Sequence, residues 1–147
     1  MQTYHREVAG ALLFGTCGRI ILQQRDDIPT ILYPGMIGIF GGHRENGESF
    51  LACVQREIHE EIGCLIPLER FEPLMRCQAK FSDGSSLEGE YFLAHGVPSD
   101  RLTVTEGTAL FATLDELPQL LPRMAPSACF ITRYFLTSLP DPGATRP

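Results

Sequence analysis

The sequence lacks paired cysteines of the C-x-x-C kind. Its 147 residues contain five cysteines, and this odd number at irregular spacing fits neither a disulfide framework nor a zinc site. A reducing compartment is therefore expected, where a free cysteine packs as a small hydrophobic residue. We expect inert core positions for all five, namely Cys17, Cys53, Cys64, Cys77 and Cys129.

Positive charge is also scarce, and no long apolar run is present. Asp and Glu outnumber Lys and Arg by 18 to 12, and the net charge of −6 repels nucleic acid and anionic membranes. The apolar run at residues 8–14 is too short to target the chain or to span a membrane. These deficits predict a cytoplasmic protein without a nucleic-acid polymer or a membrane as partner. A polyanionic substrate would need local cations or a bound metal.

Repeats and low-complexity linkers are absent from the chain as well. The composition, 44% apolar and 20% charged, is that of an ordinary folded protein. A chain of this length buries a sizeable core without disulfides or a structural metal. We expect a single domain over residues 1–140 and a disordered tail at residues 141–147.

The predicted secondary structure places strands before and after one clear helix. Apolar residues at steps of three and four predict a helix over residues 49–62, capped by Asn46 or Ser49 and ended by Gly63. Turn signals predict that the first two strands form a hairpin, as do the fourth and fifth. The predicted strands are residues 8–14, 19–25, 36–40, 73–81, 87–95 and 106–112, and the other helices are residues 114–121 and 127–139. This pattern predicts a mixed α/β domain built in layers.

The stretch GGHRENGES, residues 41–49, comes close to a phosphate-binding loop. From Gly42 it reads G-x-x-x-x-G-E-S, with Glu48 at the position where the loop would have lysine. A carboxylate there would repel phosphates, which excludes a P-loop nucleotide binder. An EF-hand calcium loop is excluded too, because the D-x-[DN]-x-[DN]-G pattern is absent.

The predicted helix carries carboxylates that should destabilise it. Glu57, Glu60 and Glu61 share one face, and the like-charge pair at i, i+4 is unfavourable by a few tenths of a kcal/mol. Two of these acids lie in the last turn, where the helix dipole costs each of them roughly 0.3–1 kcal/mol. They either form a solvated acidic face or bind a hard divalent cation such as Mg²⁺, which takes carboxylate oxygens as ligands.

Residues 42–64 resemble the signature of the Nudix hydrolases, G-x5-E-x7-R-E-U-x-E-E-x-G-U, where U is a bulky aliphatic residue. The last aliphatic position holds Cys64, a mild departure. Upstream, a strand ends in Arg25, as in many members, whereas Phe40 stands where many members have proline. The matching positions are Gly42, Glu48, Arg56, Glu57, Ile58, Glu60, Glu61 and Gly63.

The resemblance implies an α/β/α sandwich with a mixed central sheet and a catalytic loop and helix after a short strand. It also implies hydrolysis of a nucleoside diphosphate linked to another group, with Mg²⁺ or sometimes Mn²⁺. The implied metal ligands are the carboxylates of Glu57, Glu60, Glu61 and Glu106 with the carbonyl of Gly41. The same helix carboxylates are the candidate catalytic groups, and the general base is Glu57 or an acid outside the signature such as Glu106, Glu88 or Glu90.

Further roles follow from the resemblance for the surrounding residues. Glu48 and Arg56 brace the loop against the helix by an ion pair. Arg25 contacts a substrate phosphate or is an ordinary surface arginine. His43 contacts substrate or only occupies the loop. The aromatic residues Tyr4, Tyr33 and Phe81 are more often core residues than rings that stack on a base.

Two hypotheses of different classes stay open. The chain is a Nudix enzyme acting on a small nucleotide derivative, or a catalytically inactive Nudix-fold module that senses a nucleotide. Intact carboxylates favour the enzyme. Nucleoside triphosphates, nucleotide sugars, dinucleotide polyphosphates and coenzymes all remain open as substrates. The small size favours a compact substrate or a homodimer that completes the pocket.

Overall fold

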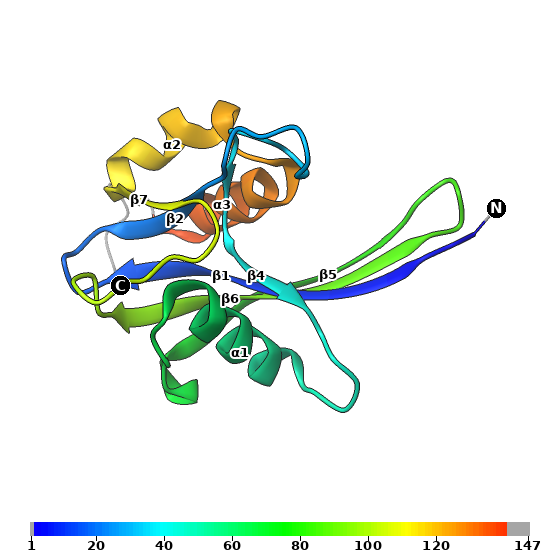
Figure 1. Cartoon of the computed structure of the whole chain (residues 1–147), viewed down its shortest axis with the longest axis horizontal. Coiled ribbons are helices and arrows are strands. Elements are labelled where there is room, and N and C mark those ends of the chain that lie inside the picture. Colours follow the sequence, from blue (N-terminus) through cyan, green and yellow to red (C-terminus); the bar gives the residue numbers. More distant parts are fainter. Residues whose placement is uncertain (1, 141–147) are drawn as a thin grey trace.

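A long central strand, β1, organises the sheet (Figure 1). The computed structural model of the chain describes residues 2–140, so the predicted tail at residues 141–147 lies outside the described residues. Strand β1 (His5–Gly15) runs parallel to β6 (Ser86–Val97) on one side and antiparallel to β2 (Ile20–Gln24) on the other. The predicted mixed sheet is therefore confirmed.

Both predicted hairpins form. Strand β1 turns into β2 with Leu13 opposite Ile21, and β5 (Phe71–Lys80) pairs antiparallel with β6. The strand order is β3-β2-β1-β6-β5, and β7 (Thr108–Ala112) pairs with β2 outside this path. Strands that are distant in the sequence thus meet around β1 and β2.

The glycine pair continues the sheet. We predicted one strand over residues 36–40, whereas the structure has β3 (Ile37–Gly38) and β4 (Phe40–His43). Strand β3 pairs with β2, but β4 pairs with β1 and places Gly41 opposite Gly10. The predicted end of this strand is wrong, because bonds to β1 carry it through both glycines. A Cβ on Gly41 would overlap the backbone of β1, so only glycine permits this close pairing.

Helix α1 (Phe50–Ile62) ends at the predicted residue and begins one residue after the predicted start. Of the two predicted caps, Ser49 acts, its Oγ accepting a hydrogen bond from the Ala52 N–H at 3.0 Å. Gly63 adopts the left-handed conformation, with φ of 74°, and its N–H donates to the carbonyl of His59. The remaining helical elements are η1 (Leu68–Arg70), η2 (Leu114–Glu116), α2 (Leu117–Leu120), η3 (Leu121–Arg123) and α3 (Pro126–Ser138).

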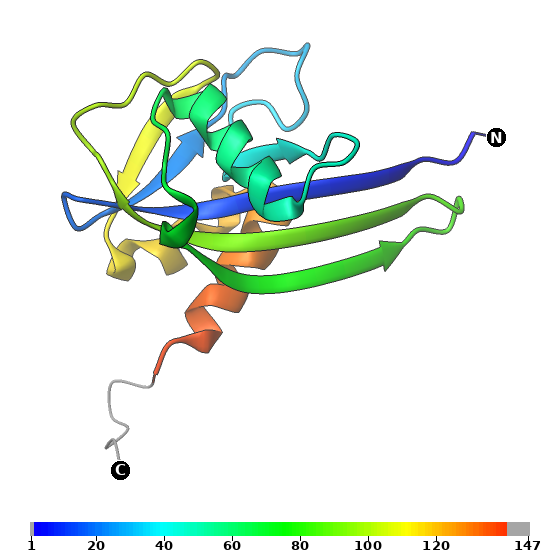
Figure 2. The ribbon, with the colours of Figure 1, turned by 90° about the horizontal axis from the view of Figure 1, so that it is seen from below.

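Two apolar clusters, one on each face of the sheet, produce the predicted α/β/α layers. Figures 1 and 2 show α1 and α3 on opposite sides of β1. Successive residues of a strand point to opposite faces, so Ala11 and Leu13 pack with Ile58 of α1. Leu12, between them, packs with Phe135 of α3 on the other face.

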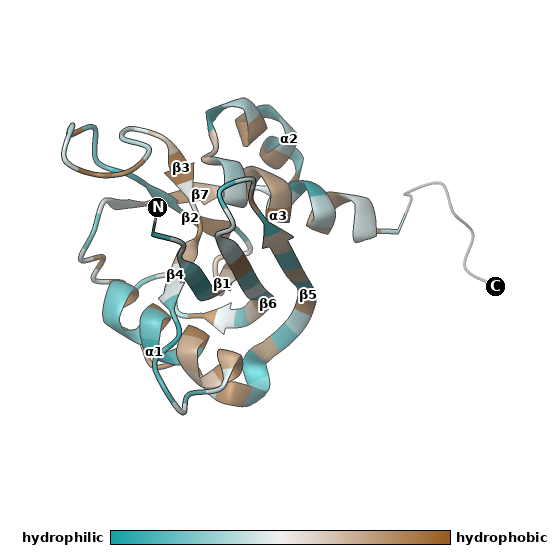
Figure 3. Ribbon diagram, turned by 90° about the vertical axis from the view of Figure 1, so that its right-hand side faces the viewer, coloured by the Kyte–Doolittle hydropathy of each residue, from teal (hydrophilic) through white to brown (hydrophobic). Residues whose placement is uncertain are grey.

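The amino-terminal half of β1 and the β5–β6 hairpin project beyond the helices as a curved arm (Figures 1 and 2). Helices α1 and α3 each carry both hydrophilic and hydrophobic residues, as expected for helices that pack on a sheet by one side (Figure 3). None of the helices in residues 2–140 has the length and apolar character needed to cross a membrane.

The cysteines do not all lie in the core. Cys53 is buried, but Cys17 is exposed and the other three are half-buried. Cys17 lies in the turn between β1 and β2, from which a side chain reaches neither apolar cluster. The prediction of five core cysteines is therefore wrong, most clearly at Cys17.

Candidate active site

The glycine pair of β4 lies directly against the carboxylates of α1. A Cβ on Gly42 would overlap the carboxylate of Glu57, so the glycine leaves the space that this carboxylate fills. Cys53, one turn earlier on α1, donates from Sγ to the Gly42 carbonyl at 3.7 Å. The side chains of Cys53 and Glu57 therefore pack directly against the backbone of β4.

Arg56 joins the loop to the helix. Its Nε and Nη2 donate to the two oxygens of Glu48 at 2.7 and 2.9 Å, and its Nη1 donates to Glu57 Oε1 at 2.9 Å. Nη2 also donates to the His43 carbonyl at 3.1 Å, and Nη1 lies 3.4 Å from Glu60 Oε1. The guanidinium lowers the pKa of Glu48 to about 2, so this pair is charged at any physiological pH.

Arg44, which the sequence did not single out, ties the same loop to the sheet. Its Nε and Nη2 donate to Glu7 Oε2 on β1 at 3.0 and 2.5 Å, and its Nη1 donates to the Glu48 carbonyl at 2.8 Å. The guanidinium also lies 5.1 Å from the centroid of the Phe50 ring at the start of α1. Two arginines thus hold the loop, one from the helix and one from the loop itself.

Glu61 lies near the end of α1 among other acids. Burial, followed by the negative charge of Glu57, raises the pKa of Glu61 to about 8. The charges of Glu106 and Glu60 raise it further, whereas the backbone of Gly41 lowers it. Glu61 therefore lies close to these acids and to the backbone of β4.

The segment before β7 brings Glu106 to this end of α1. The Thr105 N–H donates to the Glu61 carbonyl at 3.0 Å, and the buried Gln23 donates from Nε2 to the Glu106 carbonyl at 3.1 Å. We predicted Glu106 as the first residue of a strand, but it lies in the loop before β7. The loop places it near Glu61 by satisfying the helix carbonyls left free at the end of α1.

The side chains of Glu57, Glu60 and Glu61 do not converge on one point in this arrangement. Within residues 2–140, three ligand atoms of acids, histidines or cysteines come within 4.8 Å of one another at His5, Glu7 and Glu88. That trio lies on β1 and β6, and its Glu7 is already paired with Arg44. It is not the set that the signature implies.

The carboxylates of α1 nevertheless fit a hard divalent cation. The ligand atoms that the signature implies are all oxygens, the type that Mg²⁺ and Mn²⁺ prefer. The neighbouring acids make ionisation of Glu61 unfavourable, and a cation among them would remove that penalty. The space that Gly42 leaves open is already filled by a carboxylate rather than by an apolar group. The donor set and its charge therefore suit the metal that the signature implies.

The two other acids considered as a general base lie on β6. Glu88 is next to His5 and Glu7 on β1, and Glu90 forms an ion pair with Arg76 of β5. Neither is linked to Glu61 by a hydrogen bond within the described part of the chain. A role for either as the base stays a prediction.

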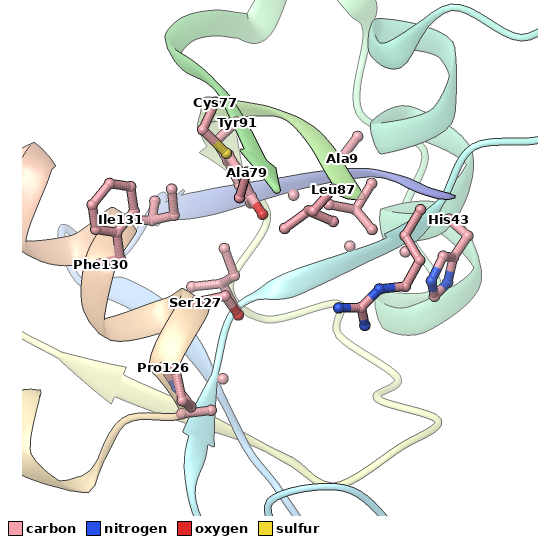
Figure 4. Close-up of a pocket in the computed structure, with 18 of the residues that line it drawn as sticks. Ala9, His43, Cys77, Ala79, Leu87, Tyr91, Pro126, Ser127, Phe130 and Ile131 are labelled. Atoms are coloured by element: carbon pink, nitrogen blue, oxygen red, sulfur yellow. The ribbon is translucent and has the colours of Figure 1, made fainter. Parts of the chain in front are cut away.

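A cavity of about 660 Å³ lies between the sheet and α3 (Figure 4). Figure 4 shows Ser127 and Phe130 of α3 on one side, and Cys77 and Tyr91 of the β5–β6 hairpin on the other. The cavity extends to Gly41, Gly42 and His43 of β4, where Glu57 touches the opposite side of the backbone. One strand is thus shared by the cavity and the carboxylates.

Arg25 and His43, the two predicted substrate-binding residues, both line this cavity. Arg25 donates from Nε to the Leu32 carbonyl at 2.8 Å, which leaves its Nη groups without a hydrogen bond to residues 2–140. Arg6 is the second arginine in the wall, and no carboxylate belongs to the wall among the described residues. A chain of net charge −6 thus presents a cationic wall in this cavity.

Tyr33 and Phe81 are not core residues. Their side chains are 40% and 46% exposed, and both line the cavity. Tyr33 also has a positive φ of 52°, which is uncommon for a residue with a side chain. The third candidate ring, Tyr4, is 58% exposed and is not part of the cavity wall. The expectation that these rings are core residues is therefore wrong.

A family model described as NUDIX domain matches residues 4–134. The chain belongs to the Nudix hydrolase family. The match spans the sheet, α1 and most of α3, so it covers the signature and the cavity together.

Known Nudix proteins resemble the chain in sequence and in fold. Nudix hydrolase 3 of Arabidopsis thaliana is 30% identical over 112 residues, which cover 69% of this chain and 14% of that protein. A MutT structure from work on Aliivibrio salmonicida and Vibrio cholerae has a TM-score of 0.71 at 18% identity, covering 92% of this chain and 99% of that one. A MutT Nudix hydrolase from Burkholderia pseudomallei has a TM-score of 0.68 at 24% identity, covering 88% and 97%. The two structures show a shared Nudix fold.

Residues that the Nudix signature does not specify were missed because nothing local marks them. Arg44 occupies a variable position of the signature, and its partner Glu7 comes from a strand 37 residues earlier. Tyr91 fits the period-two alternation of β6, which predicts burial and gives no sign of a cavity. Ser127 and Phe130 stand on a helix whose partner face was unknown.

Proposed function

We propose that this chain hydrolyses the phosphoanhydride bond of a nucleoside diphosphate linked to a further group, with Mg²⁺ or Mn²⁺. The observation that carries the proposal is the strand shared by the carboxylates and the cavity. Gly42 contacts Glu57 on one side and belongs to the cavity wall on the other. A substrate in the cavity would therefore bring its diphosphate to the metal-binding carboxylates.

The proposed metal ligands are the carboxylates of Glu57, Glu60, Glu61 and Glu106 and the carbonyl of Gly41. When bound, a divalent cation neutralises phosphate charge and makes a bound water more acidic. Four acids near one strand fit such a cation because their mutual repulsion otherwise disfavours full ionisation.

Arg56 orients the candidate catalytic carboxylate. It holds Glu57 through Oε1, which leaves Oε2 free to accept a proton from the attacking water or to bind metal. The Arg56–Glu48 pair fixes that guanidinium, since both Glu48 oxygens accept from it. Glu48 and Arg56 therefore act by positioning, whereas Glu57 acts on the reacting atoms. Glu106 is the alternative base, because it lies beside Glu61 outside the signature.

Arg25 and His43 would bind the substrate phosphates. Both belong to the wall of the cavity, and His43 ends the strand that carries the glycine pair. The free Nη groups of Arg25 suit two phosphate oxygens. The aromatic and apolar remainder of the wall fits the nucleoside part of such a substrate.

A screen of nucleotide derivatives with Mg²⁺ and with Mn²⁺, followed by product identification, tests the proposal. Products formed in ¹⁸O-labelled water show which phosphorus the water attacks. We expect cleavage at a phosphoanhydride in at least one of four classes: triphosphates, nucleotide sugars, dinucleotide polyphosphates and ADP-ribose-type coenzymes. Binding of nucleotides without cleavage of any of them would instead support the sensor module.

A further inference from the structure

Tyr91 is a buried phenol that the protein leaves without a polar partner. Its side chain is only 6% exposed, and its hydroxyl makes no hydrogen bond with any residue between 2 and 140. Thr132 Oγ1 is also unpaired, but it is sealed inside the protein, whereas Tyr91 belongs to the cavity wall. The Tyr91 hydroxyl is therefore a polar group that a bound molecule can reach.

Two glycines fix the position of the Tyr91 ring. Tyr91 lies opposite Gly10 on β1, and a Cβ there would come within 3.3 Å of the ring. A Cβ on Gly89, two residues earlier on β6, would lie 2.8 Å from the ring and 3.2 Å from the hydroxyl oxygen. The ring thus fills a slot that larger residues would close. A rigid, slotted ring directs its hydroxyl to one place in the cavity.

The Tyr91 hydroxyl is open to the cavity, since Thr132 Oγ1 is the one sealed side-chain oxygen or nitrogen without a partner among the described residues. No described residue bonds to the Tyr91 hydroxyl, so it adds nothing to the contacts within the protein. Phenylalanine would fill the same slot equally well. The hydroxyl is therefore explained better by a ligand than by the fold.

The residues around the hydroxyl indicate the chemical class of the ligand. The exposed rings of Tyr33, Phe81 and Phe130 border the same cavity. They come from the segment between β2 and β3, the β5–β6 turn and α3, respectively. Burial raises the pKa of Tyr91 to about 12, so the phenol is neutral and can donate at physiological pH. Flat apolar walls with one fixed donor match a planar heteroaromatic ring that carries an acceptor.

We propose that Tyr91 determines specificity by hydrogen bonding a ring nitrogen or carbonyl oxygen of the nucleobase of the substrate. The nucleobase lies between α3 and the β5–β6 hairpin, with its sugar toward β4. This inference rests on the proposed function, because it assigns the nucleoside end of the same substrate. Beyond that function, Tyr91 is the residue that recognises the base.

Measuring the binding of reaction products tests the role of Tyr91 independently of the proposed hydrolysis. Calorimetry with Mg²⁺ would compare AMP, GMP, CMP and UMP with ribose 5-phosphate, which lacks a base. The proteins are the wild type, Tyr91→Phe and the matched control Tyr134→Phe. Tyr134 is a 43% exposed tyrosine of α3 that is not part of the cavity wall.

We expect at least one nucleotide to bind the wild type more tightly than ribose 5-phosphate. Tyr91→Phe should weaken that nucleotide about three- to tenfold, the range for a neutral hydrogen bond, and leave ribose 5-phosphate unchanged. Tyr134→Phe should change neither. Without nucleotide, Tyr91→Phe should melt at the same temperature as the wild type or higher, since the hydroxyl has no partner to lose.

Three results would overturn the assignment of Tyr91. One is equal binding of every nucleotide and ribose 5-phosphate. Another is a Tyr91→Phe variant that weakens the binding of nucleotide and of ribose 5-phosphate equally, or that changes the binding of neither. The third is a lower melting temperature for Tyr91→Phe, which would mean that the hydroxyl already has a structural partner. Base binding without hydrolysis would support the assignment of Tyr91 and contradict only the proposed hydrolase activity.

Discussion

The acidic residues of α1 and of the loop before it differ in the groups that contact their carboxylates. Glu48 and Glu57 accept hydrogen bonds from Arg56, whereas the half-buried Glu61 lies near three other acids. An arginine partner stabilises a carboxylate in the protein alone, whereas Glu61 would gain a comparable partner from a bound cation. Neighbouring carboxylates of one helix can thus have opposite effects on stability.

Replacing Glu61 by glutamine should therefore stabilise the metal-free protein and weaken metal binding. Glu61→Gln keeps the shape of the side chain and removes the charge that Glu57, Glu106 and Glu60 oppose. In thermal melts without metal, we expect the variant to unfold at a higher temperature than the wild type. Added Mg²⁺ or Mn²⁺ should raise the wild-type melting temperature and raise that of the variant less.

A matched control for this experiment is Glu69→Gln, in the exposed element η1. It should leave both melting temperatures unchanged. An equal metal-induced shift in Glu61→Gln and the wild type would contradict the proposed metal site.

The Glu48–Arg56 pair predicts a defined loss of stability in acid. The pKa of Glu48 falls from 4.5 to about 2 on folding because Arg56 donates to it. For a carboxyl group whose pKa is lowered, the added stability is complete above pH 4.5 and is lost as the pH falls toward 2. The free energy of unfolding of the wild type should therefore exceed that of Glu48→Gln at neutral pH, and the gap should close between these two values.

Urea unfolding of both proteins from pH 7 to pH 2 measures this gap. A constant difference over the whole range would show that the ion pair is not its source.

Single residues of the signature could be placed from the sequence because their spacing is fixed by one helix. The face shared by Glu57, Glu60 and Glu61 follows from the helical period. Arg44 could not be placed in this way, because its partner Glu7 comes from a strand whose register depends on the sheet. Local periodicity determines neighbours on one helix and says nothing about partners across the fold.

Helix α1 depends on a cap that the sequence shows. Ser49→Ala should cost about 1 kcal/mol of stability, because the N–H of Ala52 loses its acceptor. For a domain of this size, that corresponds to a melting temperature lower by about 2–4 °C. Ser49→Asp is the matched control and should keep the stability, since its carboxylate can accept the same hydrogen bond. A similar loss in both variants would mean that the cap contributes nothing.

Strand β4 could be predicted only in part. Its apolar beginning was visible, but its continuation through Gly41 depends on pairing with Gly10, far away in the sequence. Likewise, the loop that places Glu106 is held by the carbonyls at the end of α1 and by Gln23. An element held by contacts within its own segment could be predicted from the sequence. An element whose bounds depend on hydrogen bonds to a distant segment could not.

At the scale of the whole molecule, the sheet separates the carboxylates of α1 from the cavity beside α3. Helix α1 brings the carboxylates to one face, and α3 closes a cavity on the other. The layers could be predicted from the alternation of apolar residues and from the Nudix signature. The cavity could not, because its wall combines β1, β4, β5, β6, α3 and the segment between β2 and β3. A cytoplasmic location and a homodimer stay predictions.

Two cysteines report on this arrangement. Cys77 belongs to the cavity wall, and burial raises its pKa, whereas hydrogen bonding with Ser99 and the Arg19 backbone lowers the pKa of the exposed Cys17. Iodoacetamide should therefore alkylate Cys17 faster than Cys77. Saturating the Glu57→Gln variant, which we expect to be inactive, with its substrate should protect Cys77 from alkylation and leave the rate at Cys17 unchanged.

Peptide mass spectrometry of the alkylated protein measures both rates. Equal rates at Cys77 with and without substrate would place the substrate outside the cavity.

Turnover of the wild type and of Glu57→Gln, both folded and both with Mg²⁺, tests the central claim most directly. With the nucleotide derivative that the wild type cleaves best, we expect kcat to fall by at least a hundredfold in the variant, while Glu69→Gln turns over like the wild type. Equal turnover in Glu57→Gln, or no cleavage of any nucleotide derivative by the wild type, would contradict the account.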